Sequence, residues 1–250
     1  MTSPLDAVRA HIANHPRSQQ KAIGPSEVGT PCDRRLGYKL AGVEGKDDRD
    51  GWLPTIGTAT HTWLEGALEA ENKRLGRERF LIERKMALPL PGGETLGGKI
   101  DFYDTDDDSV NDWKVVGATT LKEAKRGRVD TKYIVQAQIY GLGMWWERFD
   151  VKTINIIFVP RNAPLRDTVI HTVEFDKEFA ADAIARLDDI QLAVKLLDVE
   201  ALPNLKTTND RCNYCPFFNL ASTDARTSCP GSEDYRLQVT SVGGLVGTTN

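Results

Sequence analysis

The chain lacks the features that would assign it to several protein classes at once. No apolar run approaches the roughly 20 residues that a membrane-spanning helix needs. The segment from Met1 to Asp6 has no basic stretch followed by an apolar one, which is the pattern of a secretory signal. A Gly-x-x-x-x-Gly-Lys-Ser/Thr loop is also missing, so we expect no ATP-driven motor in this chain. These absences predict a cytoplasmic protein with no membrane partner.

Positive charge is not in excess either. The 250 residues carry a formal net charge of −4 at pH 7, which argues against a general coat for nucleic acid. Only four cysteines are present, and disulfides are rare in the cytoplasm, so we expect no disulfide framework. The length suffices for one large domain. We expect a single domain at 1–239 and a disordered tail at 240–250.

Hydrophobic periodicity indicates how helices and strands alternate along the chain. After a first short helix, the segment 25–41 has Ser26 as its expected N-cap. The segment 42–55 is polar and rich in Gly and Asp, which is typical of a loop. We expect helices at 4–14, 56–75, 119–126, 131–148 and 177–198, and strands at 79–90, 95–104, 108–117, 153–160 and 167–175. This order predicts an α/β fold with a mixed central sheet flanked by helices.

Two strand-like segments carry carboxylates that could share a cation. Asp101 ends a Gly-rich segment, and Asp112 lies in an apolar one. Lys114 follows Asp112 by two residues and therefore lies on the same strand face. The acid-x-Lys pattern occurs seven times in the chain, but only this copy lies in an apolar, β-prone stretch after a strand with its own Asp. Two carboxylates for a divalent metal, with a lysine to offset charge on phosphate, suit hydrolysis of a phosphodiester.

A histidine could complete a metal site with these two carboxylates. His61 lies in an expected helix and shares a face with Glu65, four residues further on. A single histidine on a helix is more often structural, so its candidacy depends on the two aspartates. One imidazole with two carboxylates suits Mn²⁺ or Mg²⁺, and the imidazole favours Mn²⁺. The backbone carbonyl of Trp113 is a candidate further ligand. Glu65 is expected to contact the ligands rather than the metal itself.

A polar stripe follows on the expected helix at 131–148. Lys132, Gln136 and Tyr140 recur every four residues and share one face. An ordinary exposed face would explain the stripe. Its position after the acid-x-Lys strand favours a row of donors aimed at phosphates and at the lysine. The segment 122–128 before it is locally basic, which suits contact with a polyanion but also suits a solvated helix end.

The cysteines are the second strong signal. They are Cys32, Cys212, Cys215 and Cys229. The Cys-x-x-Cys spacing is typical of metal ligands, and four thiolates can close a zinc site or hold an iron–sulfur cluster. A proline follows both Cys215 and Cys229, as is familiar beside iron–sulfur ligands. Such a site would pack the segment 203–232 on residues 25–40 and join the two ends of the domain. Zinc is the alternative cofactor, and a redox pair is less favoured because no thioredoxin-like strand precedes it.

Together these motifs resemble the PD-(D/E)XK nuclease superfamily. They match its RecB-like exonuclease branch with a four-cysteine iron–sulfur cluster, which includes CRISPR-associated, AddB-like and phage exonucleases. The resemblance covers about residues 24–230 in the family's order. The matching segments are Ser26 to Arg34 with the first cluster cysteine, His61, Gly98 to Asp101, Asp112 to Lys114, and Gln136 to Tyr140. Two departures are Asp112, where the branch more often has Glu, and the long gap from Cys215 to Cys229.

The resemblance implies a restriction-endonuclease-like core and a metal-dependent exonuclease acting on DNA ends. Asp101, Asp112 and His61 would hold Mg²⁺ or Mn²⁺, and the cysteines a 4Fe-4S cluster. Lys114 would position the attacking water and stabilise the charged phosphate. Gln136 and Tyr140 would orient that lysine or the scissile phosphate. The residues expected to bind the DNA backbone are Arg126, Arg128 and Lys132, which would make affinity salt-dependent.

The biological role and the partners are broader expectations. The resemblance implies action on single-stranded DNA or double-strand ends in recombination, repair, replication or CRISPR adaptation. A recombinase, a helicase or CRISPR adaptation proteins are the implied partners, and a homo-oligomer is an open expectation. A structure-specific endonuclease, a non-catalytic DNA-binding protein with a structural zinc site, and a redox sensor are the alternatives. No sequence-reading element is evident, so we expect recognition of DNA shape and ends.

Overall fold

The computed structural model describes residues 3–15, 22–46, 51–209, 212–233 and 235. The chain divides into two compact units. The first unit comprises Met1–Gln20, Gly24–Gly29 and Asp50–Ala185, and the second comprises Lys21–Ile23, Thr30–Arg49 and Arg186–Asn250. The single domain expected at 1–239 stays a prediction, and the expected tail at 240–250 lies outside the described residues.

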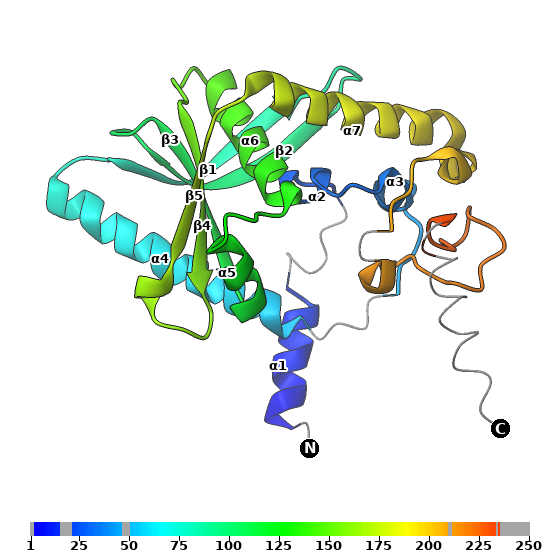
Figure 1. The fold of residues 1–250 in the computed structure, drawn as a ribbon, viewed down its shortest axis with the longest axis horizontal. Coiled ribbons are helices and arrows are strands. Elements are labelled where there is room, and N and C mark those ends of the chain that lie inside the picture. The colour runs from blue at the N-terminus through cyan, green and yellow to red at the C-terminus, as the bar shows by residue number, and fades with distance from the viewer. Residues whose placement is uncertain (1–2, 16–21, 47–50, 210–211, 234, 236–250) are drawn as a thin grey trace. The chain divides into compact units, whose positions relative to one another are not determined.

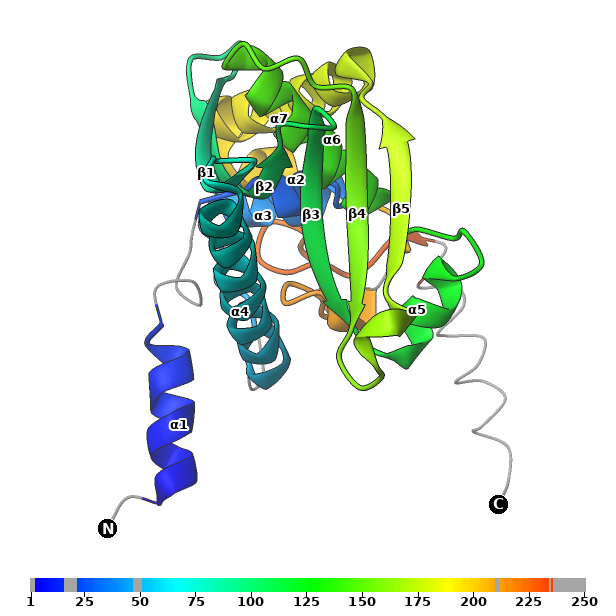
Figure 2. The ribbon, with the colours of Figure 1, turned by 90° about the vertical axis from the view of Figure 1, so that its left-hand side faces the viewer.

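A five-stranded sheet forms the centre of the first unit (Figure 1), and its strands follow the order β1-β2-β3-β4-β5 (Figure 2). The strands are β1 (Phe80–Pro89), β2 (Thr95–Asp104), β3 (Ser109–Val116), β4 (Thr153–Pro160) and β5 (Val169–Glu174). β3 and β4 run parallel, and every other neighbouring pair is antiparallel. The sheet is therefore mixed, as the order of the elements predicted.

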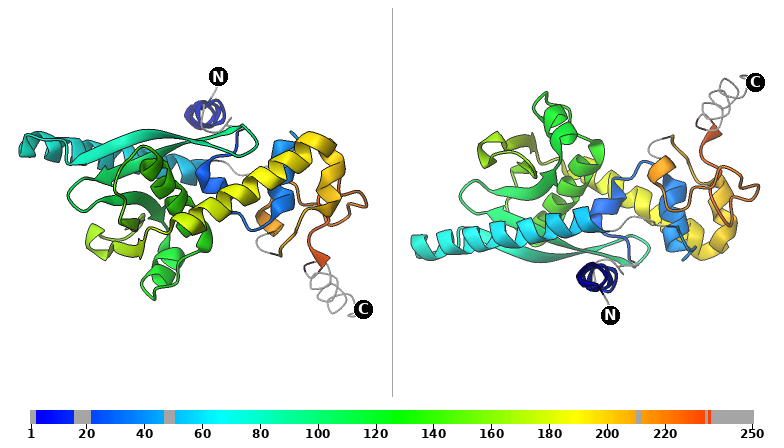
Figure 3. Two further views of the ribbon diagram at one scale, coloured as in Figure 1. Left: turned by 90° about the horizontal axis from the view of Figure 1, so that it is seen from above. Right: turned by 90° about the horizontal axis from the view of Figure 1, so that it is seen from below.

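Helices cover both faces of this sheet. Those of the first unit are α1 (Pro4–Ala13), α2 (Pro25–Val28), α4 (Trp52–Leu75), α5 (Ala118–Ala124) and α6 (Thr131–Trp146), and α7 (Lys177–Leu197) follows β5. Leu64 of α4 packs with Ile157 of β4, whereas Tyr133 of α6 contacts Phe158, the next residue. Successive residues of a strand point to opposite faces, so α4 and α6 lie on opposite sides of the sheet (Figure 2 and Figure 3). Within the described residues, no helix combines the length and apolarity needed to cross a membrane.

Two expectations about the N-terminal segments are wrong. The N-cap of α2 is Gly24 rather than Ser26, and the Gly24 backbone N–H donates to a Glu27 carboxylate oxygen at 3.3 Å. Pro25 takes the first helical position, where its missing N–H costs nothing. The segment 25–41 also breaks after α2, because Pro31 disfavours helical geometry in the residue before it.

The helix expected at 56–75 begins earlier than its pattern indicates. α4 starts at Trp52, after Gly51 as N-cap with φ 68°, so part of the expected loop at 42–55 is helical. Pro54 lies within the first turn, where a proline removes no intrahelical hydrogen bond. Gly51 and Pro54, at the start of α4, are residues typical of loops, so the sequence pattern did not reveal that the helix begins there.

The second unit has an apolar core of its own. Tyr38 of α3 (Asp33–Leu40) is fully buried and clusters with Leu202 and Cys229. Its ring stacks on Phe217 at a centroid distance of 5.0 Å, and its hydroxyl donates to the carbonyl of Ala225. Short 3₁₀ turns η2 (Asp198–Asn204) and η3 (Cys212–Tyr214) shape the C-terminal part. Segments from near both ends of the chain therefore form one packed unit.

Candidate active site

The two candidate carboxylates lie where β2 and β3 stop pairing. The ladder between these strands ends at the pair Phe102↔Asn111, so Asp101 and Asp112 are next in register without ladder bonds. Instead, the backbone N–H of Trp113 donates to Oδ2 of Asp101 at 2.6 Å. Beyond this point β2 remains paired with β1, and β3 with β4. The sheet therefore opens between β2 and β3 at the two carboxylates.

Asp112 is a buried carboxylate with a nearby cation. It is 2% exposed, and its Oδ2 lies 2.5 Å from Nζ of Lys114. This contact is an ion pair, and Oδ2 has no hydrogen-bond partner among the described residues. Burial raises the pKa of Asp112 to about 6; Lys114 opposes the shift and the charge of Asp101 adds to it. One ammonium group thus balances the charge of the carboxylate, and burial still favours its protonated form.

Gln136 of α6 joins this carboxylate to the lysine. Its Oε1 accepts a hydrogen bond from Nζ of Lys114 at 2.8 Å, and its Nε2 donates to Oδ1 of Asp112 at 3.2 Å. The same Nε2 contacts the hydroxyl of Tyr140 at 3.1 Å. The helix stripe identified from the sequence is therefore turned toward the acid-x-Lys strand at Gln136 and Tyr140.

His61 reaches the site from α4. Its Nδ1 lies 3.3 Å from Oδ1 of Asp101, and both side chains are largely buried. Glu65 follows one turn later on the same helix and is half-buried. The structure thus brings an imidazole to one carboxylate and an ammonium group to the other.

Two glycines allow the elements around the site to approach closely. A Cβ on Gly98 would lie 2.8 Å from Cγ of Pro25 and 3.2 Å from Cε1 of Tyr140. A Cβ on Gly29 would lie 2.6 Å from the backbone of Lys132. Contacts this short force a shift of the neighbouring atoms, so any larger residue would separate α2 from β2 or from α6. The glycine of the Gly-x-apolar-Asp motif therefore has a packing role, which the sequence reasoning did not assign.

The donor set fits a divalent cation by its chemistry. No group of three or more His, Cys, Asp or Glu side chains in the described part of the chain is arranged to hold a metal. Lys114 and His61 instead lie beside the carboxylate oxygens. Two carboxylates and one imidazole are nonetheless ligands that Mn²⁺ and Mg²⁺ accept. A buried Oδ2 of Asp112 that accepts no hydrogen bond is the atom that such a cation would satisfy.

The residues expected to bind DNA are engaged in ion pairs. Nη1 of Arg126 lies 3.2 Å from Glu123, and Arg128 contacts the same carboxylate. Hydrogen bonding from Arg128 is the largest effect that lowers the pKa of Glu123. Nζ of Lys132 lies 3.2 Å from Asp130. Carboxylates of the same chain thus offset part of the positive charge that the sequence indicated at this surface.

The four cysteines lie in the second unit as free thiols. Cys212 and Cys229 are buried, and the other two are half-buried. Burial raises the pKa values of Cys212 and Cys215, and the neighbouring cysteines act in the same direction on both. This mutual effect indicates that the sulfur atoms lie close enough to interact electrostatically. Buried thiols with raised pKa values ionise readily only beside a cation, which is the chemistry of metal ligands, but no three of them in the described part of the chain are arranged to hold a metal.

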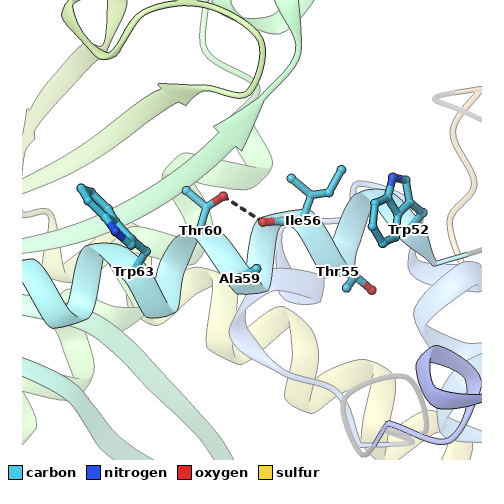
Figure 4. A pocket seen from close by; sticks show the side chains of 6 residues that line it. All are labelled: Trp52, Thr55, Ile56, Ala59, Thr60 and Trp63. Carbon is cyan, nitrogen blue, oxygen red and sulfur yellow. Dashed lines mark hydrogen bonds between the residues drawn. The ribbon is translucent and has the colours of Figure 1, made fainter. Parts of the chain in front are cut away.

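A separate hollow of about 440 Å³ lies along the outward face of α4 (Figure 4). The described residues that line it are Trp52, Thr55, Ile56, Ala59, Thr60 and Trp63. His61 follows Trp52 by nine residues, which is about two and a half turns at 3.6 residues per turn. The hollow therefore opens on the side of the helix away from His61 and is not part of the candidate active site.

No family model and no curated protein sequence matches the chain. Its fold is similar to the crystal structure of SSO0001, with a TM-score of 0.51 and 16% identity, over 88% of this chain and 95% of that one. An alkaline exonuclease (LHK-Exo) from Laribacter hongkongensis gives a TM-score of 0.41 and 12% identity, over 72% of this chain and 91% of that one. LHK-Exo in complex with dAMP gives 0.45 and 14%, over 72% and 90%. The similarity to SSO0001 concerns the fold alone.

Proposed function

We propose that this chain is a metal-dependent deoxyribonuclease that hydrolyses phosphodiester bonds at DNA ends. One observation carries the proposal. Asp101 and Asp112 are next in register at the point where the sheet opens, with Lys114 beside Asp112 and Gln136 bonded to both members of that pair. Two carboxylates and a fixed ammonium suit attack of water on a phosphodiester. The resemblance of these motifs to the RecB-like branch of the PD-(D/E)XK superfamily supports DNA ends as the substrate.

The metal in this proposal is Mg²⁺ or Mn²⁺. His61, Asp101 and Asp112 would hold it, with the carbonyl of Trp113 as a further ligand. Bound there, the metal would lower the pKa of a water and neutralise phosphate charge. The buried Oδ2 of Asp112, which accepts no hydrogen bond, supports this set of ligands.

Lys114 would place a positive charge where negative charge develops on the phosphate. Gln136 supports this role because it restrains the lysine through its amide oxygen and Asp112 through its amide nitrogen. The Tyr140 hydroxyl contacts that nitrogen. This contact keeps the amide oxygen turned toward Lys114.

Arg126, Arg128 and Lys132 would bind the DNA backbone. The arginines pair with Glu123 at the surface and Lys132 pairs with the half-buried Asp130, and such pairs contribute little to stability. Phosphates can therefore displace the carboxylates, and the binding would weaken as salt increases.

A 4Fe-4S cluster on Cys32, Cys212, Cys215 and Cys229 would stabilise the second unit, with Zn²⁺ as the alternative. It would join the N-terminal and C-terminal segments that already share an apolar core. Recombination, repair, replication or CRISPR adaptation remains the proposed setting. A recombinase, a helicase or CRISPR adaptation proteins remain the proposed partners. The proposed location is the cytoplasm, and a homo-oligomer remains an expectation.

The test is digestion of linear DNA labelled separately at each end, beside covalently closed circular DNA, with Mg²⁺, Mn²⁺ or chelator. We expect metal-dependent loss of label from linear DNA, intact circles, and no cleavage by Asp112→Asn. Cleavage of circles or branched DNA in preference to ends would favour the structure-specific endonuclease. Binding without any cleavage by the wild type would favour the non-catalytic alternative.

A further inference from the structure

One aromatic ring at the edge of the candidate active site attracts two lysines. Nζ of Lys114 lies over the ring of Tyr133, 5.3 Å from its centroid, and Nζ of Lys132 lies over the same ring at 4.9 Å. Because both distances end on one centroid, the two ammonium groups lie within about 10 Å of each other. Each is inside the range in which a ring face attracts a cation. Tyr133 stands outside the motifs that the sequence analysis identified.

The ring packs against the sheet, and the helix that carries it is capped. It packs edge-to-face on Phe158 of β4, with centroids 5.9 Å apart and planes at 69°. Phe158 is the register partner of Lys114 in the parallel β3–β4 pair. At the start of α6, the side chain of Asp130 accepts from the backbone N–H of Lys132 at 3.1 Å. Tyr133 and Lys132 therefore share the first turn of α6, and the Tyr133 ring packs on a strand residue beside the catalytic lysine.

The spacing of the two cations suits one strand of a nucleic acid. Each strand presents a phosphate about every 3.4 Å along the helix axis, so groups within about 10 Å can meet phosphates close together on one strand. Asp112 and Asp130 balance the two ammonium groups while no polyanion is bound. The negative face of the ring lowers the cost of holding two like charges near each other.

We propose that Tyr133 is a positioning residue that holds Lys114 at the scissile phosphate and Lys132 at a neighbouring phosphate of the same strand. The proposal rests on the nuclease function proposed above. It adds a side chain that determines how the DNA strand is placed. Its action depends on the aromatic face rather than on the hydroxyl, so phenylalanine should replace it.

Steady-state digestion of end-labelled DNA by Tyr133→Phe and Tyr133→Leu tests the idea. We expect Tyr133→Phe to stay within about twofold of wild type, and Tyr133→Leu to lower kcat and raise KM by about 3- to 30-fold each, from the strength of a cation–π contact. Trp145→Leu is the matched control, because it removes another cation–π contact of α6, with Lys177 at 3.8 Å. It should leave both constants unchanged. Equal losses in the Phe and Leu variants, or none in the Leu variant, would overturn the proposal.

A second measurement does not depend on activity. Lysine ε-methylene signals in NMR spectra shift upfield over an aromatic ring, and Lys114→Arg and Lys132→Arg identify the two signals. We expect both shifts in wild type and Tyr133→Phe, and their loss in Tyr133→Leu or, should that variant fold poorly, in Tyr133→Met. Unshifted wild-type signals would overturn the proposal even if cleavage occurs. Shifted signals in a protein that cleaves no DNA would overturn the nuclease function and leave the ring contact standing.

Discussion

Nζ of Lys114 lies 2.5 Å from Oδ2 of Asp112, two residues before it on the same face of β3. Gln136 bonds to both side chains from the helix above them. The lysine therefore lies beside the same carboxylate that would bind a metal ion. Removing the lysine, the carboxylate or the amide should produce three different changes in cleavage and stability.

Lys114→Ala should lower the rate of the chemical step by about 10²- to 10³-fold, the loss typical when one group that stabilises transition-state charge is removed. DNA binding should remain, because Lys114 is one cation among several. Lys152→Ala is the matched control, since Asp150-x-Lys152 has the same spacing but Lys152 is exposed and pairs with Asp108. Single-turnover digestion with circular dichroism as a folding check compares the two. Cleavage retained by Lys114→Ala would remove this lysine from the mechanism.

Asp112→Asn should stabilise the metal-free protein at neutral pH. Burial raises the pKa of Asp112 to about 6 in the folded state, whereas an unfolded aspartate titrates near about 3.9. Between these values the folded protein holds a proton that the unfolded chain has lost. The free energy of unfolding therefore decreases as pH rises from about 4 to about 6 and stays lower above that. The full effect is on the order of 2–3 kcal/mol.

Urea unfolding in chelator between pH 4 and 8 measures this effect. The stability advantage of Asp112→Asn over wild type should be small at the acidic end and reach its maximum above pH 6. Added Mg²⁺ or Mn²⁺ should stabilise the wild type more than the variant. A wild type that is the more stable protein at pH 7.5 without metal would contradict the raised pKa of Asp112.

Gln136→Ala should lower cleavage by about 10- to 100-fold, because Lys114 loses the acceptor that restrains it. Gln138→Ala is the matched control from the same helix. Gln138 is also buried, but it bonds to the backbone of Glu174 and Asp176 away from the site. That change should reduce the free energy of unfolding by about 1–3 kcal/mol and keep cleavage. Digestion rates and urea midpoints are measured for both variants. Equal cleavage by Gln136→Ala and Gln138→Ala would contradict the role of Gln136.

Cys212→Ser should lower the melting temperature by several degrees and release the bound metal, because a four-thiolate site contributes folding free energy. Chelator-treated wild type should then match the variant. Iron with sulfide and broad visible absorbance would identify a 4Fe-4S cluster, and one zinc per chain with no colour would identify the alternative. If the wild type as purified, before any chelator treatment, contained no metal and melted at the same temperature as Cys212→Ser, a structural cluster would be refuted.

Much of the fold follows from local periodicity. β4 matches the expected strand at 153–160 at both ends, since a continuous apolar run suits a strand buried on both faces. The errors occur at Ser26 and in the loop expected at 42–55, where proline and glycine decide helix starts through backbone geometry that an apolar pattern does not reveal.

By itself, the sequence determined which side chains share a face. Asp112 and Lys114 share one because side chains alternate along a strand, and Gln136 and Tyr140 share one because a helix repeats every 3.6 residues. Both relationships involve residues close in the chain, so they required no knowledge of packing.

Only the tertiary structure decided how those faces meet. It ended the β2–β3 ladder just before Asp101 and Asp112, placed the ring of Tyr133 against two lysines, and paired Glu123 with the nearby arginines. The physical reason is that strand register, helix docking and side-chain rotamers depend on contacts throughout the folded unit. Two elements with the same local pattern can meet in several registers, and the packed core selects one of them.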